Sequence, residues 1–328
     1  MTPEELKQRI LNETQAELGS IEAALRANLT PHLELVKDIA GHLLFAGGKR
    51  LRPLLMVLCA RLCGYRGDYD VTFSTIFEYI HAATLLHDDV IDGGILRRGR
   101  PAAHRVWDAA SVVLTGDFLL ARALSIAART GMERVIAVVA AVTEEMAQGE
   151  IFQLQCRGKI DIGEDEYLSI IRGKTAVLFQ AACRISAILA RAPAAAEKAL
   201  ADYGYHLGLA FQIADDLLDY TQDSAVLGKL PGADLREGKL TLPVIHALAM
   251  APAADRERMA RIISTPDFSA EDFKFLIGLL RHYDGIGYAW RKATGHVRES
   301  KTALAAFPES PARSILTDIA DYALSRQS

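Results

Sequence analysis

Proline placement is the feature that most restricts how this chain can fold. No proline occurs between Pro53 and Pro101, or between Pro101 and Pro193. Across both intervals apolar residues return every three or four positions, which is the period of amphipathic helices. Signals for strands are nearly absent, because no Asn-Gly or Asp-Gly pair joins two alternating runs. The sequence therefore predicts an all-α protein.

The helical pattern runs through the whole chain without a low-complexity linker or an internal period. We expect helices near residues 3–28, 32–45, 53–63, 72–92, 102–109, 112–129, 132–156, 164–171, 174–190, 195–221, 240–250, 253–264, 269–282, 284–305 and 309–325. Pro53 is expected to open one helix, and Gly64 to follow its C-terminus. The simplest architecture is a single all-α domain over residues 1–328.

Two copies of one acidic motif, DDxxD, end two of these apolar runs. They are Asp88, Asp89 and Asp92, and Asp215, Asp216 and Asp219. The first and last acids of each copy share a helix face, roughly 5–6 Å apart, and repel each other. The negative end of the helix dipole adds to this repulsion. One copy alone is typical of a solvated surface, but two copies after buried-type stretches indicate a cavity rim that binds cations. Mg²⁺ bridging to substrate phosphates suits such oxygen ligands.

Overall composition excludes several other classes. A net charge of −4 argues against a general nucleic-acid binder. Four cysteines, which form no CxxC pair, are interpreted as small buried side chains of a reducing, cytoplasmic protein: Cys59, Cys63, Cys156 and Cys183. The N-terminal residues lack the features of a signal peptide. The longest apolar stretch, 135–142, is far shorter than a membrane-spanning helix, so none is expected.

Short basic elements lie between the acidic motifs at expected loops and helix starts. They are Gly47–Pro53 (GGKRLRP), Leu96–Gly99, Gly173–Thr175, Gly228–Asp234 and Glu237–Lys239. Arginine forks and lysine point charges, together with bridging Mg²⁺, are the usual means of holding anions with several oxygens. The combination indicates a substrate that carries anionic groups with several oxygens.

These ordered motifs resemble those of the trans-prenyltransferases, the isoprenyl diphosphate synthases, and the resemblance covers nearly the whole chain. It is greatest to the bacterial long-chain members. The resemblance implies a helical bundle around a product cavity, in which an allylic diphosphate, farnesyl diphosphate by preference, ionises and is attacked by isopentenyl diphosphate. Mg²⁺ and preorganised cations would stabilise the departing diphosphate. It further implies a homodimer, with peripheral membrane association for product release.

The resemblance also implies particular residue roles. The acids expected to bind Mg²⁺, three ions in all, are Asp88, Asp89, Asp92, Asp215 and Asp219, assisted by Asp216. The cations expected on the allylic diphosphate are Arg97, Lys174 and Lys229, with Lys239 close by. Those expected on isopentenyl diphosphate are Lys49, Arg50, Arg52, His81 and Arg98. Thr175 and Gln212 are expected to present oxygen dipoles to the forming carbocation. Gly93 departs from many relatives, which carry a further acid there.

In the family that the chain resembles, the helix before the first motif often forms the floor of the product cavity, so the resemblance implies that product length depends on it; helices 112–129 and 132–156 are the alternatives. Ala83 and Thr84, five and four residues upstream of Asp88, are small and would let a growing chain pass. Ile80, Phe77 and Phe73 lie further along, and each helical turn adds about 5.4 Å of depth. We therefore expect a long product of roughly thirty carbons or more, with forty preferred, at about one isoprene unit per turn.

Other functions remain open at this stage. A shorter-chain, geranylgeranyl-type synthase would share every motif. A class I terpene cyclase would need no isopentenyl diphosphate pocket, and its second metal motif usually contains Asn or Ser. A non-catalytic prenyl-binding subunit typically loses one acidic motif, whereas this chain keeps both. A simple divalent-ion binder would not explain the basic elements.

Overall fold

The computed structural model describes residues 2–129, 131–221, 232–265 and 267–325. The α-helices are α1 (Pro3–Glu13), α2 (Gln15–Asn28), α3 (Glu34–Leu44), α4 (Leu51–Leu62), α5 (Tyr69–Ile91), α6 (Ala109–Ala128), α7 (Glu133–Cys156), α8 (Glu164–Ile171), α9 (Val177–Leu189), α10 (Ala194–Thr221), α12 (Ala233–Arg236), α13 (Leu242–Met250), α14 (Ala253–Ile263), α15 (Ala270–His282), α16 (Gly285–Leu304) and α17 (Pro311–Ser325). The remaining elements are strands β1 (Leu96–Arg97) and β2 (Arg100–Pro101), the 3₁₀ turn η1 (Ala103–Arg105) and the π-helix η2 (Arg172–Ala176). The all-α prediction is confirmed.

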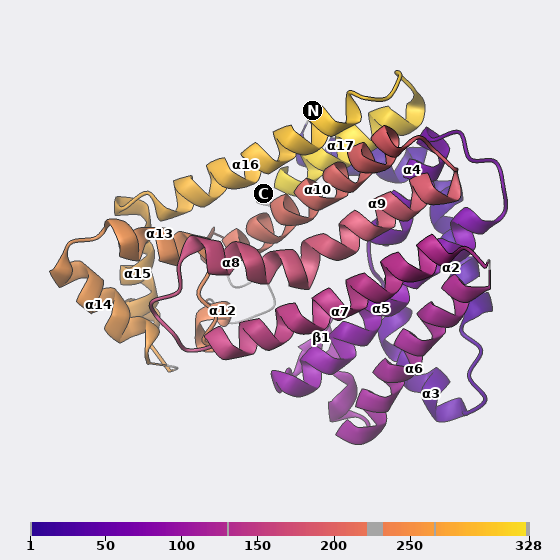
Figure 1. The fold of residues 1–328 in the computed structure, drawn as a ribbon. Helices are drawn as coiled ribbons and strands as arrows, with labels where there is room; N and C mark the ends of the chain where they lie inside the picture. The colour runs from indigo at the N-terminus through magenta and orange to yellow at the C-terminus, as the bar shows by residue number, and fades with distance from the viewer. Residues whose placement is uncertain (1, 130, 222–231, 266, 326–328) are drawn as a thin grey trace.

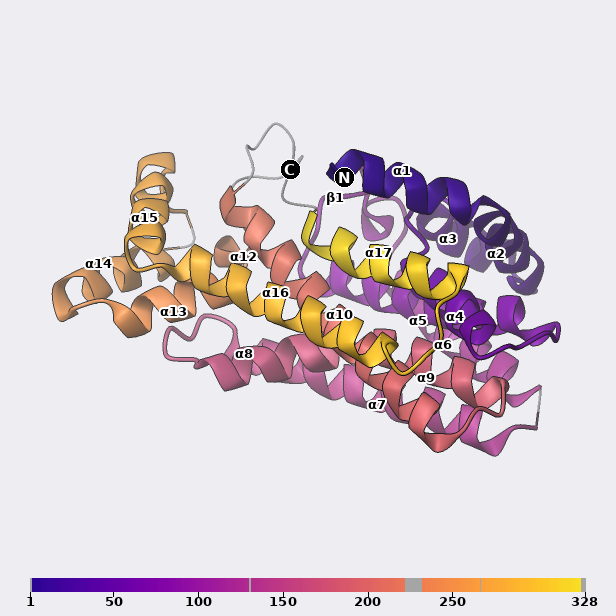
Figure 2. The same cartoon turned by 90° about the horizontal axis from the view of Figure 1, so that it is seen from above.

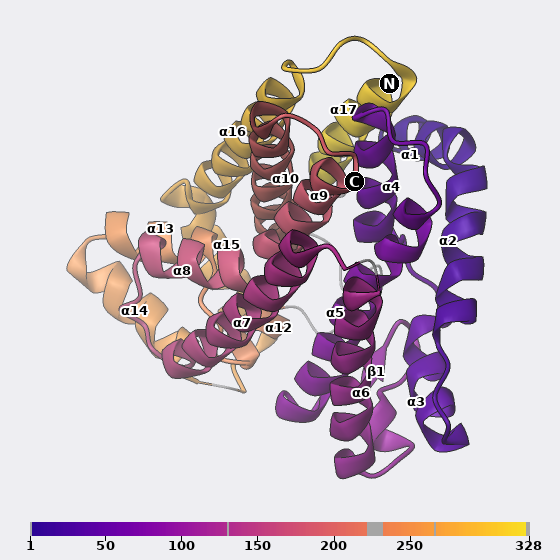
Figure 3. The same cartoon turned by 45° about the vertical axis from the view of Figure 1, so that its right-hand side comes forward.

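The long helices form a bundle in which α10 is central. It packs against α9 on one side and α16 on another, while α5 packs against α4 and α6. Figures 1 and 2 show α13, α14 and α15 at one end of the bundle, and α2 and α4 at the other. Helix α9 packs against α4, α7 and α10, and α5 lies alongside α6 (Figure 3).

Two hydrophobic clusters stabilise the bundle. The larger includes Leu55, Phe77 and Phe179, and the smaller surrounds Leu217 and Leu276 near α13–α16. Helix α10 contributes residues to both clusters, so the two cores share one helix. We propose on this basis that residues 1–328 form one domain.

Several predicted boundaries are wrong. The expected helix 3–28 divides at Thr14, whose hydroxyl donates to the Ile10 carbonyl (2.7 Å), a local bond that competes with the helix. Pro53 is the third residue of α4 rather than its first. The expected helix 102–109 is only the turn η1. The short helix α12 was not predicted. Gly64 does follow α4, with φ +75°.

A small hairpin, which was not predicted, follows α5. Strands β1 and β2 pair antiparallel, with Arg97 opposite Arg100. The two residues between them, Arg98 (φ 52°) and Gly99 (φ 74°), both have positive φ. This is the geometry of a two-residue type I′ turn, whose twist matches that of the paired strands. Arg98 is therefore held in an unfavourable backbone conformation beside the acidic motif.

Helix α6 is long and apolar enough to cross a membrane by length and composition alone. Of the 18-residue segment that meets this criterion, 33% is buried inside the protein. Core helices of globular proteins meet the same criterion, so this finding carries no conclusion about a membrane.

Candidate active site

Both acidic motifs lie at one large cavity of about 1390 Å³. Its walls come from α5, α6, α7, η2 and α10, together with the 46–52 loop and the β1–β2 hairpin. The residues of the predicted site that line it are Lys49, Arg50, Arg52, Ile80, His81, Thr84, Asp88, Asp89, Asp92, Arg97, Arg98, Lys174, Thr175, Gln212, Asp215 and Lys239. Four others do not line it: Phe77, Ala83, Asp216 and Asp219. Lys229 lies outside the described residues.

Each acid of the first motif faces a cation. Arg97 donates to Asp89 (2.5 Å), and Lys239 donates to Asp92 (2.9 Å). Lys174 lies 3.4 Å from Asp88. Burial raises the pKa of Asp88, although Lys174 opposes the shift. These pairs place a positive charge beside each carboxylate of the first motif.

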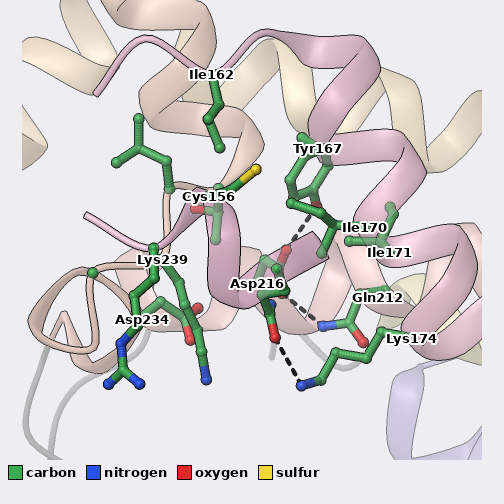
Figure 4. A pocket seen from close by; sticks show the side chains of 15 residues that line it. Cys156, Ile162, Tyr167, Ile170, Ile171, Lys174, Gln212, Asp216, Asp234 and Lys239 are labelled. Atoms are coloured by element: carbon green, nitrogen blue, oxygen red, sulfur yellow. Dashed lines mark hydrogen bonds between the residues drawn. The ribbon is translucent and has the colours of Figure 1, made fainter. Parts of the chain in front are cut away.

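The acids of the second motif have three different surroundings. Asp215 lines the large cavity and is exposed. Asp219 accepts from the backbone N–H groups of Ala233 (3.0 Å) and Asp234 (3.1 Å), and so holds the start of α12 against α10. Asp216 is buried, and burial raises its pKa to about 7, although hydrogen bonds from neighbouring side chains oppose the shift. Figure 4 shows Asp216 in a smaller cavity of about 100 Å³ behind η2.

Each of the three guanidinium nitrogens of Arg50 donates a hydrogen bond within the protein. Its Nε donates to Glu22 (2.6 Å), one terminal nitrogen donates to Glu78 (2.6 Å), and the other donates to the Leu44 carbonyl. Arg50 is also only 4% exposed and has a positive φ of 47°. Its guanidinium therefore anchors the loop that presents Lys49 and Arg52.

Arg52, in contrast, has an Nε without a hydrogen-bond partner. Its guanidinium carbon lies 4.6 Å from the centroid of the Phe179 ring, and burial lowers its pKa to about 10. Burial and the nearby arginines, Arg52 first among them, hold the pKa of His81 well below its usual range. A neutral imidazole beside an under-satisfied guanidinium forms a site ready for an anion.

The two arginines of the hairpin donate hydrogen bonds to different partners. Arg97 faces Asp89, whereas Arg98 donates to the carbonyls of Leu43 (3.2 Å) and Gly47. The type I′ turn thus separates the two guanidinium groups. One lies at the acidic motif and the other at the loop that carries Lys49.

The π-helix η2 positions Lys174 and Thr175. A Cβ on Gly149 of α7 would lie 2.8 Å from the Gly173 Cα, so α7 and η2 touch backbone to backbone. Helix α10 approaches equally closely, because a Cβ on Gly208 would lie 2.6 Å from the Ala176 Cα. The extra residue of a π-turn is often found at functional sites. Here it turns Lys174 and Thr175 toward the cavity.

Sequence reasoning missed several polar residues of the site. Glu150 and Gln153 of α7 accept from Lys174 at 2.8 Å and 2.9 Å. Arg157 lies 3.3 Å from Asp92, and Glu237 accepts from Lys239. Glu78 is buried beneath Arg50. The available signal was a single acid within an otherwise apolar helical stretch, as at Glu78.

The apolar end of the cavity lies between α5, α6 and α7. Ile80 and Thr84 of α5 face Leu120 of α6, and Thr143 and Met146 of α7, across the same space. Of the predicted length determinants, Thr84 and Ile80 line this space. Ala83 and Phe77 are instead completely buried in the larger hydrophobic cluster.

A preformed metal cage is absent from the part of the chain that the structure describes, because no three His, Cys, Asp or Glu side chains there form a group able to hold an ion. Mg²⁺ is commonly held by one or two carboxylates plus substrate phosphates. The oxygen donors Asp88, Asp92 and Asp215 on one cavity fit that mode.

The fold and this cavity are those of a prenyltransferase. The chain matches the polyprenyl synthetase family over residues 33–280. It is 37% identical over 320 residues to octaprenyl diphosphate synthase of Escherichia coli (strain K12), covering 96% of this chain and 98% of the relative. It is 37% identical over 323 residues to all-trans-nonaprenyl-diphosphate synthase (geranyl-diphosphate specific) of Rhodobacter capsulatus, covering 98% of each chain.

Solved structures give the same result. A decaprenyl diphosphate synthase from Rhodobacter capsulatus has a TM-score of 0.92 at 41% identity, covering 98% of this chain and 99% of that one. A polyprenyl synthase from Caulobacter crescentus CB15, complexed with calcium and isoprenyl diphosphate, has a TM-score of 0.91 at 38% identity, covering 98% of each. The chain belongs to the polyprenyl synthetase family and is an enzyme that transfers prenyl groups. The family prediction is confirmed.

Two arginine variants test the different roles of Arg50 and Arg52. Arg50→Met should lower the free energy of unfolding by about 3 kcal/mol, because it leaves the buried Glu78 carboxylate without its cation. Arg52→Met should lower it by less than about 1 kcal/mol, the scale of a cation–π contact, and should raise the KM for isopentenyl diphosphate at least about tenfold. Denaturant titration and steady-state kinetics would measure both. An equal loss of unfolding free energy in the two variants would contradict these different roles of Arg50 and Arg52.

Proposed function

We propose that the enzyme condenses isopentenyl diphosphate with an allylic diphosphate, farnesyl diphosphate by preference, and repeats the step to give a long-chain polyprenyl diphosphate. One observation carries the proposal. A single cavity is lined by the first acidic motif, by Asp215 of the second motif and by two separate groups of cations, and part of its wall is apolar.

The two cation groups support two diphosphate sites. Arg97, Lys174 and Lys239 each contact an acid of the first motif, and would bind the allylic diphosphate there. Lys49, Arg52, His81 and Arg98 lie around the 46–52 loop and would bind isopentenyl diphosphate. Arg50 would support that loop rather than touch substrate. Lys229, a further proposed ligand of the allylic diphosphate, lies outside the described residues.

We propose Mg²⁺ as the metal, with three ions held by Asp88, Asp89, Asp92, Asp215 and Asp219 together with substrate phosphates. Bound Mg²⁺ would neutralise the charge that develops on the departing diphosphate. When the diphosphate binds, Arg97, Lys174 and Lys239 would exchange their carboxylate partners for phosphate oxygens. Thr175 and Gln212 face the cavity and would stabilise the allylic cation through oxygen dipoles.

The condensation needs no protein nucleophile. The double bond of isopentenyl diphosphate attacks the allylic cation, and the resulting cation loses a proton to the departing diphosphate. The product is one isoprene unit longer and keeps a diphosphate, so it can re-enter the same cycle. A terpene cyclase would have no use for the cations around Arg52.

A long product, with forty carbons preferred, is supported by the apolar wall. Asp88, Thr84 and Ile80 lie along one stripe of α5, spanning about 12 Å at 1.5 Å per residue. Neither upstream position carries an aromatic ring. The relatives include synthases named for octaprenyl, nonaprenyl and decaprenyl products. They also include a geranylgeranyl diphosphate synthase, which supports a shorter geranylgeranyl-type product as the second candidate.

We further propose a homodimer in the cytoplasm that touches a membrane only to release product. Leu114 and Leu124 of α6 are 66% and 37% exposed. Covering these apolar side chains with a second copy of the chain would remove them from water.

The metal assignment predicts a large rate loss when either acidic motif is altered. Asp88→Ala and Asp215→Ala should each lower kcat by roughly three orders of magnitude, because metal charge stabilisation supplies several kcal/mol. Both variants should remain folded. The assay is incubation with radiolabelled isopentenyl diphosphate, farnesyl diphosphate and Mg²⁺, followed by chromatography of the dephosphorylated products. No chain elongation by the unaltered enzyme would refute the proposed function, and near-normal turnover in a variant would refute the metal role.

The apolar wall predicts that Thr84, and not Ala83, controls product length. Thr84→Phe should shorten the product to about fifteen or twenty carbons, because its ring enters the cavity one turn from Asp88. Ala83→Phe is the matched control. Its ring would enter the core instead, and overpacking should cost about 1–3 kcal/mol of stability. Chromatography and thermal melting would separate the outcomes. A folded, active Thr84→Phe enzyme with an unchanged product would refute the proposal that the growing prenyl chain passes Thr84.

A further inference from the structure

Four side chains behind the large cavity form one unbroken chain of hydrogen bonds. The Thr175 hydroxyl donates to Gln212 Oε1 (2.7 Å), and Gln212 Nε2 donates to Asp216 Oδ1 (2.7 Å). The Tyr167 hydroxyl donates to Asp216 Oδ2 (2.6 Å). Figure 4 shows Tyr167 and Gln212 both directed at Asp216. Only Thr175 and Gln212 also line the large cavity.

Helix packing places these groups in register. Gly204, Gly208, Gln212 and Asp216 lie four residues apart, so they form one stripe along α10. A Cβ at Gly204 would lie 2.5 Å from the Phe179 carbonyl oxygen, and one at Gly208 would lie 2.6 Å from the Ala176 Cα. The glycines bring α10 against α9 and η2. The polar end of the same stripe then meets Thr175 and Tyr167.

The order of donors determines which way each group points. Both oxygens of Asp216 accept a hydrogen bond, one from the Tyr167 hydroxyl and one from the Gln212 amide. Gln212 must therefore turn its amide NH₂ toward Asp216 and its carbonyl toward Thr175. The Thr175 proton is then committed to Gln212, which leaves the lone pairs of its oxygen for the cavity. An oxygen dipole in this orientation stabilises positive charge.

Tyr167 is the distant end of this chain. It is 2% exposed, and it lies on the smaller cavity beside Ile162 and Ile170, away from the acids of the first motif. Removing its hydroxyl would leave Asp216 buried with Gln212 as the single side-chain donor of the two. Asp216 would then lose its fixed orientation, and with it Gln212 and Thr175.

We propose that Tyr167 is a positioning residue for prenyl transfer, acting through Asp216 and Gln212 to hold the Thr175 oxygen toward the forming carbocation. This inference rests on the proposed function of the same site. It assigns Asp216 to orienting Gln212 rather than to binding metal. It also explains why the middle acid of the second motif is buried while Asp215 is exposed.

A double-mutant cycle tests the inference. Tyr167→Phe keeps the ring and removes only the hydroxyl, and Thr175→Val keeps the shape and removes the oxygen. Each should lower kcat about tenfold, with the KM of both substrates within about twofold of its original value. The double variant should be no slower than Thr175→Val by more than about twofold, because both changes remove one effect.

Tyr203→Phe is the matched control. Tyr203 is also buried on α10, but its hydroxyl donates to the Leu316 carbonyl (2.8 Å), far from the cavity. This variant should lower the melting temperature and leave kcat unchanged. A purely structural Tyr167 would give the same pattern as the control.

Two results would overturn the inference while leaving the proposed function intact. One is an unchanged kcat in Tyr167→Phe. The other is a multiplicative loss of about a hundredfold in the double variant, which would mean that the two residues act independently. Failure of the unaltered enzyme to elongate farnesyl diphosphate would instead refute the proposed function itself.

Discussion

Opposite charges that neutralise one another around a single cavity determine the rest of this structure. The carboxylates come from the ends of α5 and α10, where repulsion and the helix dipole both oppose them. Cations from the hairpin, η2 and the segment after α12 offset that cost, as in the pairs Asp89–Arg97, Asp88–Lys174 and Asp92–Lys239. An unpaired buried charge would cost several kcal/mol. Under the proposed function, substrate and metal would therefore bind by exchange: each phosphate oxygen would take a cation, and each Mg²⁺ would take a carboxylate.

Such exchange needs rigid walls, and close backbone packing provides them. The contact between Gly149 and Gly173, and that between Gly208 and Ala176, hold α7, η2 and α10 nearer than side chains would allow. The π-turn in η2 then places Lys174 on one side and Thr175 on another. Precise placement of charge is what preorganised electrostatic stabilisation requires. The same packing leaves an apolar space between α5, α6 and α7, into which a growing prenyl chain can extend.

Sequence pattern was sufficient for the fold class and for most of the cations and acids at the cavity, because helical periodicity and charged motifs are local signals. It failed where local backbone geometry or tertiary contacts decide the outcome. The break at Thr14, the type I′ turn at Arg98 and the π-turn in η2 depend on local geometry that periodicity does not encode. Ala83 was predicted to line the product path, yet it faces the core, since spacing alone does not give the rotation of α5. The role of Arg50 was likewise hidden, because its partner Glu78 lies 28 residues away.

The central claim is that acids and cations bind substrate together through a shared metal. Calorimetric titration of the protein with inorganic diphosphate, first in saturating Mg²⁺ and then in EDTA, tests it most directly. The account predicts binding at least about tenfold tighter with Mg²⁺, and an equal effect of diphosphate on Mg²⁺ affinity by linkage. The difference should disappear in Asp88→Ala. Equal affinity in Mg²⁺ and in EDTA would contradict the account, because the cations alone would then suffice.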